Sequence, residues 1–231
     1  MSAEPVQPTE LGADLRHVRS WIFDLDDTLY PPERQILKRV SERIGQFMVR
    51  ATGLPLEEAR ALQGRYLMDH GAALGGLMKD YTIDPGVFLA EVHDVPLDDL
   101  EADEGLRAGL ERLKGPRYVF TNGSTRHGER VLARLGVADL FDGLFAIEHA
   151  RLAPKPHPDT FALMLDQFGL DPVKAAFFED TARNLEHAKE LGMTTVLVGP
   201  HAFDAEAPFV DHRAAALGPF LATAILPGDP T

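Results

Sequence analysis

Two aspartates, Asp24 and Asp26, follow directly after the apolar run at residues 21–23. A short apolar run of this kind predicts a buried β-strand, which here ends just before the aspartates. Side chains at positions i and i+2 of an extended segment point the same way, so both carboxylates are expected to face one site. Together with the hydroxyl of Thr28, they can share a metal ion and divide the steps of a phosphoryl transfer. Aspartates are also common at turns and helix N-caps, where they bind only backbone N–H groups.

Two later apolar runs also end in polar side chains. In open parallel sheets, ligands bind beyond the carboxyl ends of the strands, so the residues that follow each run are candidates for one site. Turn preferences alone rarely place so many acidic groups at one edge of a sheet. The candidates are Asp24 and Asp26 after the first run, Thr121, Asn122 and Gly123 after residues 118–120, and Glu179 and Asp180 after residues 177–178.

The acidic side chains predict a cation site. Asp24, Asp26 and Asp180 repel one another at one sheet edge unless a cation lies between them. Hard oxygen ligands without nearby histidine or cysteine favour Mg²⁺, which commonly bridges to a phosphate. A phosphate needs a further positive group, and the best candidate is Lys155, which is flanked by two prolines that stiffen its backbone. The alternative for Lys155 is an ordinary solvated lysine.

The alternation of helical and strand-like patterns predicts the fold class. Apolar residues recur at helical spacing over residues 34–51, and only helical patterns follow before residue 103. Strands are then predicted at residues 117–120, 143–147, 175–178 and 194–198, with helices between them. This alternation indicates an α/β, three-layer open parallel sheet with helices on both faces. The expected organisation is a flexible tail (1–17), a core domain (18–30 and 104–231) and an inserted all-helical domain (31–103).

Composition limits the partners and the compartment. The chain has 231 residues, a formal net charge of -13 and no cysteine. The negative charge argues against nucleic acid or an anionic membrane as a main partner, and the lack of cysteine excludes disulfides and thiolate chemistry. The first ten residues lack the basic and apolar regions of a signal peptide, and the apolar stretch at residues 214–226 is too short to span a membrane. We expect a cytoplasmic protein; the sequence does not indicate its oligomeric state.

Four segments together resemble a known family. They are similar, in order, to the four motifs of the haloacid dehalogenase-like (HAD) hydrolase superfamily, whose core is a Rossmann-like sheet. The segments are Asp24-Leu25-Asp26-Asp27-Thr28, Thr121-Asn122-Gly123, Lys155-Pro156 and Glu179-Asp180-Thr181-Ala182-Arg183-Asn184.

The resemblance implies a role for each motif residue. Asp24 is the implied nucleophile, which forms an aspartyl-phosphate, and Asp26 is the implied general acid and base. The implied phosphate-binding residues are Thr121, Asn122, Gly123 and Lys155, of which Thr121 and Lys155 are also implied to be catalytic. The implied ligands of Mg²⁺ are Asp24, Asp180 and the backbone carbonyl of Asp26. Glu179 and Asn184 are implied to position metal-bound water or Lys155.

The resemblance also assigns a function to the insert. In the family, a helical cap between the first two motifs covers the site and contacts the leaving group. Tyr30, Arg65 and His70 are the candidate substrate contacts. The motif Asp-Leu-Asp-Asp-Thr-Leu-Tyr-Pro, the segment Phe-Thr-Asn-Gly-Ser and residues 66–81 are similar to the pyrimidine 5′-nucleotidase branch, which implies a nucleoside 5′-monophosphate such as UMP or CMP.

Several other functions remain open. A dehalogenase needs no proton donor for halide, and the dehalogenases that the chain resembles lack an acid at the position of Asp26. A phosphatase of another small phosphometabolite, such as a sugar phosphate or phosphoglycolate, and a phosphomutase both remain compatible with the motifs. A non-enzymatic binding module is disfavoured, because binding alone does not require both aspartates.

Overall fold

The computed structural model describes residues 12–204 and 206–230, and within them six strands form one parallel sheet. The strand order is β3-β2-β1-β4-β5-β6, so β1 lies at the centre of the sheet with β2 and β4 beside it. This topology confirms the predicted fold class. The strands are β1 Ser20–Phe23, β2 Arg117–Phe120, β3 Gly143–Phe145, β4 Ala175–Glu179, β5 Thr194–Val198 and β6 His212–Ala214.

The register of the three central strands brings their carboxyl ends to one level. Phe23 of β1 lies opposite Val119 of β2 and Phe178 of β4. All neighbouring pairs are parallel, so the residues that follow these strands meet at the same edge of the sheet. Pairing of the apolar strands therefore places the polar residues that follow them side by side.

Helices cover both faces of the sheet, because successive strand residues point to opposite sides. Trp21 and Phe23 belong to one apolar cluster, which also contains buried residues of α5, α6 and α9. Ile22, between them, belongs to the other cluster, which contains buried residues of α7 and α8. The helices are α5 Glu104–Glu111, α6 Thr125–Leu135, α7 Pro158–Phe168, α8 Ala182–Glu190 and α9 Leu217–Thr223, with short 3₁₀ turns at η2 Ala138–Leu140 and η3 Pro172–Lys174.

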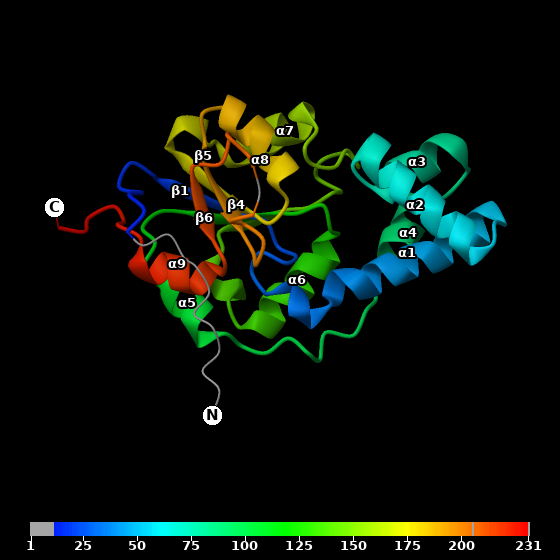
Figure 1. Cartoon of the computed structure of the whole chain (residues 1–231), viewed down its shortest axis with the longest axis horizontal. Coiled ribbons are helices and arrows are strands. Elements are labelled where there is room, and N and C mark those ends of the chain that lie inside the picture. The colour runs from blue at the N-terminus through cyan, green and yellow to red at the C-terminus, as the bar shows by residue number, and fades with distance from the viewer. Residues whose placement is uncertain (1–11, 205, 231) are drawn as a thin grey trace.

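The insert between β1 and β2 is helical, as predicted, and forms a separate lobe beside the sheet (Figure 1). Its longest helix ends at Gly53, whose φ of 73° is readily adopted only by glycine. A return segment, residues 93–103, runs back from the insert to α5 (Figure 1). The insert comprises η1 Pro32–Arg34, α1 Ile36–Thr52, α2 Leu56–His70, α3 Ala73–Asp80 and α4 Pro85–Val92.

The two ends of the described chain differ from the sequence prediction. Within the predicted tail, residues 1–11 lie outside the described residues, whereas Leu15 is fully buried and its N–H donates to Ile225 O at 2.9 Å. The packed core therefore starts before the predicted boundary at residue 18. Strand β6 was not predicted, because His-Arg-Ala offers no apolar run and joins the sheet through its backbone. None of the helices in the described part of the chain has the length and apolarity needed to cross a membrane.

Candidate active site

Lys155 joins the ends of three strands, β1, β2 and β4. Its Nζ donates to Asp24 Oδ1 at 2.6 Å, to Glu179 Oε2 at 2.7 Å and to Phe120 O at 2.7 Å. The side chains of Asp24, Lys155 and Glu179 are all buried, and Lys155 is only 1% exposed. The sequence alternative of a solvated surface lysine is therefore wrong, because burying an ammonium group requires such compensation by acceptors and negative charge.

Asn122 fixes the loop that carries Lys155. Its Oδ1 accepts from Lys155 N at 2.7 Å, and its Nδ2 donates to Lys155 O at 3.3 Å. The Asn122 side chain is thus engaged with the lysine backbone, whereas its backbone N–H has no partner among the described residues. The N–H of Gly123, the residue after Asn122, donates to Thr121 Oγ1 at 2.9 Å. The Thr121 hydroxyl keeps its own hydrogen available for another acceptor.

Asp24, Glu179 and Asp180 form an acidic cluster that could hold a metal ion, with one carboxylate oxygen of each within 4.8 Å of the others. Burial raises the pKa of Asp24 to about 7, and the negative charge of Glu179 adds to this effect. Burial likewise raises the pKa of Glu179 to about 7 and that of Asp180 to about 6. One lysine therefore leaves an excess of negative charge at this edge of the sheet, which a cation would offset.

Asp26 has a different environment from Asp24. Its Oδ1 accepts hydrogen bonds from Tyr30 OH at 2.5 Å and from His127 Nε2 at 2.7 Å. Burial favours the neutral form of Asp26, but the nearby His127 and Tyr30 outweigh it, so the pKa of Asp26 is lowered overall. The same contact raises the pKa of His127 despite its burial. The two aspartates of one strand end therefore have opposite pKa shifts.

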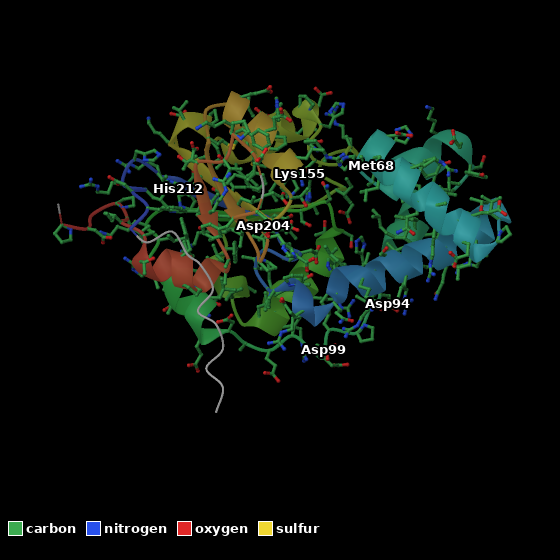
Figure 2. All side chains as sticks on the ribbon, viewed as in Figure 1. Met68, Asp94, Asp99, Lys155, Asp204 and His212 are labelled. Carbon is green, nitrogen blue, oxygen red and sulfur yellow. The ribbon has the colours of Figure 1, made fainter. Side chains whose placement is uncertain are left out.

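A cavity of about 390 Å³ connects this edge of the sheet with the insert. Figure 2 shows Lys155 on the core and Met68 on the insert, and the cavity lies between these two lobes. From the core it is lined by Asp24, Asp26, Thr121, Asn122, Gly123, Lys155, Glu179, Asp180 and Asn184, and from the insert chiefly by Leu37, Val40, Ser41, Ile44, Gln63, Leu67 and His93. The structure thus brings all the predicted core residues to one wall of a single cavity.

The three candidate contacts near the insert lie elsewhere. Arg65 is exposed and His70 half-buried, and neither lines this cavity. Tyr30 is buried and its hydroxyl is bonded to Asp26, so it approaches the site through that carboxylate. A larger cavity, about 520 Å³, opens between α5 and α9, but its wall contains neither Asp24 nor Lys155.

The comparisons with known proteins identify the family. A family model described as haloacid dehalogenase-like hydrolase matches residues 18–192. The chain belongs to the haloacid dehalogenase-like hydrolases. The resemblance predicted from the four motifs is therefore confirmed at this level. The narrower resemblance to the pyrimidine 5′-nucleotidase branch stays a prediction.

Several relatives of this HAD protein carry phosphatase names. It is 27% identical over 194 residues to the glyceraldehyde 3-phosphate phosphatase of Methanocaldococcus jannaschii, covering 78% of this chain and 85% of that protein. It is 30% identical over 193 residues to phosphate metabolism protein 8 of Saccharomyces cerevisiae, covering 77% of this chain but only 60% of that protein. The family and the phosphatase name of the archaeal relative support a hydrolase of phosphoric monoesters. A HAD phosphatase from Thermococcus onnurineus shares the fold, with a TM-score of 0.59, 20% identity and coverage of 87% of this chain and 94% of that one.

Sequence reasoning missed His127 as a component of this HAD site. His127 is fully buried in the first turn of α6, just after the second motif. The available signal was its position, because the start of a helix that follows a strand end lies at the same edge of the sheet. A lone histidine on an amphipathic helix gave no further hint of a partner 101 residues away.

Proposed function

We propose that the protein is a magnesium-dependent phosphomonoesterase that forms an aspartyl-phosphate on Asp24. The observation that carries this proposal is the difference between the two aspartates at the end of β1. Asp24 contacts Lys155 and lies in an acidic cluster, whereas Asp26 has its own hydrogen-bond donors, Tyr30 and His127. Carboxyl groups in such unlike environments are suited to different chemical roles.

The first half of the proposed reaction transfers the phosphoryl group to the enzyme. A carboxylate oxygen of Asp24 attacks phosphorus while the bond from phosphorus to the leaving oxygen breaks. Asp26 gives its proton to that oxygen, so the product leaves as an alcohol and Asp26 becomes a carboxylate. Lys155, the Thr121 hydroxyl and the Asn122 N–H are available to stabilise the phosphoryl oxygens and the charge on Asp24.

The second half releases phosphate. The Asp26 carboxylate takes a proton from water as the water oxygen attacks phosphorus, and the bond between phosphorus and Asp24 breaks. Both aspartates are then restored. In the resting site His127 and Tyr30 lower the pKa of Asp26, but a phosphate dianion beside it favours the protonated form that the first half requires.

The donor set fits Mg²⁺. The clustered ligand atoms are carboxylate oxygens, which this hard cation prefers. Asp24 and Asp180, with the backbone carbonyl of Asp26, are the proposed ligands. Glu179 is held through both oxygens, by Lys155 at 2.7 Å and by Thr181 N at 3.1 Å, whereas Oδ2 of Asp24 accepts only a long hydrogen bond, from Thr28 at 3.4 Å. When bound, Mg²⁺ offsets the repulsion between the attacking carboxylate and the phosphate. Asn184, which lines the cavity from α8, is placed to contact water in this region.

The insert wall favours a substrate with a partly apolar leaving group, and we propose a nucleoside 5′-monophosphate. Leu37 and Leu67 line the cavity and remain 38% and 51% exposed, so a flat base could cover apolar surface there. A compact, fully hydroxylated sugar would leave these side chains exposed.

A sugar phosphate or another small phosphometabolite is the second candidate, because the archaeal relative is named for glyceraldehyde 3-phosphate. A phosphomutase would use the same acid and base but return the phosphoryl group to a hydroxyl. Both are distinguished by their products.

The decisive experiment is a phosphate-release screen over nucleoside and sugar monophosphates with Mg²⁺ or EDTA. We expect release that requires Mg²⁺ and is abolished by Asp24→Asn, with the highest kcat/KM for a nucleoside 5′-monophosphate. Wild-type turnover in Asp24→Asn would exclude this nucleophile. A preference for sugar phosphates would exclude the nucleotide assignment alone, and isomerisation without phosphate release would indicate a mutase.

A further inference from the structure

Only one oxygen of the Asp26 carboxyl group is held by the protein. Tyr30 OH and His127 Nε2 both donate to Oδ1, while Oδ2 makes no hydrogen bond to any residue that the structure describes. Oδ2 lies on the side of Gly123, where an added Cβ would be 3.5 Å away. The carboxyl group is therefore anchored through one oxygen and presents the other for proton exchange.

The His127 ring has little freedom to turn. Its Nδ1 has no partner among the described residues, so its one hydrogen bond is the one to Asp26. Packing also limits the movement of the ring. Gly123 lies so close to it that an added Cβ on this glycine would be only 3.1 Å from His127 Cδ2. In addition, the ring of His93 stacks on that of His127, with centroids 4.9 Å apart and planes at 28°.

His93 comes from the insert and is itself fixed to α6. It follows the last turn of α4, at the start of the return segment. Arg130 donates to His93 O at 3.0 Å through Nη1 and to Val95 O at 2.8 Å through Nη2. Since Arg130 lies three residues after His127 on the same helix, both side chains are on one face of α6. Residues of the insert and the core thus converge on the ring that contacts Asp26.

We propose that His127 is a positioning residue that aligns Asp26 for proton transfer, with His93 as the brace that holds the His127 ring. The proposal rests on the proposed phosphomonoesterase function. In the step concerned, the proton of Asp26 moves to the leaving oxygen as the bond from that oxygen to phosphorus breaks. A carboxyl group free to rotate would spend less time with its proton directed at this oxygen, so the loss should be confined to substrates that need the proton.

The test compares two leaving groups. An alkyl phosphate needs proton donation to form the aspartyl-phosphate, whereas p-nitrophenyl phosphate releases a stable phenolate without it. We expect His127→Leu to lower kcat/KM about tenfold to a hundredfold for the alkyl phosphate, which is part of the roughly 10²- to 10⁴-fold that general acid catalysis typically contributes. For p-nitrophenyl phosphate we expect a loss of less than about threefold. His127→Gln, whose amide can still donate to Asp26, should recover part of the loss.

The brace is tested in the same way. His93→Phe keeps a ring against His127, whereas His93→Ala removes it. Only the alanine variant should therefore lower the ratio of kcat/KM for the alkyl phosphate to kcat/KM for p-nitrophenyl phosphate. If His127→Leu reduced both substrates equally, or neither, the positioning role would be excluded. If wild-type protein released no phosphate from either substrate, the failure would be that of the proposed function.

A measurement independent of activity tests the anchor itself. In nitrogen-15-labelled wild-type protein, the Nε2 proton of His127 should give a downfield resonance protected from exchange with water. The resonance should be absent in His127→Gln and exchange faster in His93→Ala. An imidazole proton that exchanges freely in the wild-type protein would overturn the proposal whatever the activity.

Discussion

Lys155 Nζ lies 2.6 Å from Asp24 Oδ1, although the two residues are 131 positions apart in the chain. The same ammonium group bonds to Glu179, so a single cation stabilises two buried carboxylates at the ends of β1 and β4. Removing one partner from a buried ion pair is far more costly than removing an exposed charge, because the remaining charges stay desolvated. Lys155 therefore supports both the fold of this edge and its proposed chemistry.

Replacing Lys155 by methionine should damage stability and activity together. We expect Lys155→Met to lower the free energy of unfolding by about 3–5 kcal/mol and to abolish phosphate release. Urea unfolding and a phosphate assay measure the two effects. The matched control is Lys174→Met, since Lys174 is exposed and its ion pair with Asp171 is on the surface; it should change stability by about 0.5 kcal/mol or less. Equal effects of the two substitutions would contradict the central role of Lys155.

Metal-free protein should lose stability as the pH rises from about 4 to about 7. The pKa of Asp24 is raised from 3.8 to about 7, and that of Glu179 from 4.5 to about 7. Between these values the folded protein retains protons that the unfolded chain has lost, so raising the pH favours unfolding. Thermal unfolding in EDTA across this range measures the effect. A melting temperature that increased steadily with pH would contradict the uncompensated charge at the site.

Mg²⁺ should reverse this loss, because it binds the deprotonated carboxylates. At a fixed concentration one hundred times its Kd at pH 8, the cation should stabilise the fold by about 2.7 kcal/mol at that pH. The same concentration should stabilise it less at pH 5, where protonation of the carboxyl groups raises the Kd. Asp180→Asn removes a proposed ligand and should abolish most of the gain. An equal shift at both pH values, or in the variant, would indicate binding elsewhere.

The apolar wall of the insert should determine the substrate. Leu67 lines the site cavity, whereas its neighbour Met68 is 72% exposed and does not. Leu67→Ser should lower kcat/KM for a nucleoside monophosphate about tenfold, the usual effect of losing one apolar contact, and should change it little for a small sugar phosphate. Met68→Ser is the matched control on the same helix and should leave both values unchanged. Equal values for Leu67→Ser and wild type would argue against a base bound at this wall.

The fold was largely predictable because each central strand is a continuous apolar run that ends in polar residues. The sequence predicts that Asp24 and Glu179 follow two strands of one parallel sheet and so lie at one edge. The structure agrees, because Phe23 and Phe178, the residues just before them, lie in register. Contacts between distant segments were less accessible. Lys155 reaches Asp24 because Asn122 holds its loop. His127 reaches Asp26 because α6 starts just after the end of β2, the strand next to β1. Such pairings depend on the assembled sheet and leave no periodic signal in the sequence.

Gly76, where α3 packs against α2, should be a sensitive position in the insert. A Cβ at Gly76 would lie 2.2 Å from Cγ of Tyr66, and the ring cannot move aside easily because it is buried and its hydroxyl donates to Asp80 at 2.6 Å. We expect Gly76→Ala to cost more than the roughly 1 kcal/mol that alanine gains in a helix, with a net loss of about 2 kcal/mol in the free energy of unfolding. Because Gly71, Ala72 and Ala73, which lead from α2 into α3, line the site cavity, the KM should also rise. Gly64→Ala is the control: this glycine of α2 is exposed with nothing within 4 Å, so alanine should stabilise the insert by about 0.5–1 kcal/mol. Urea unfolding of both variants, with opposite signs expected, decides whether close packing of Gly76 on Tyr66 maintains the wall that faces Asp24 and Asp26.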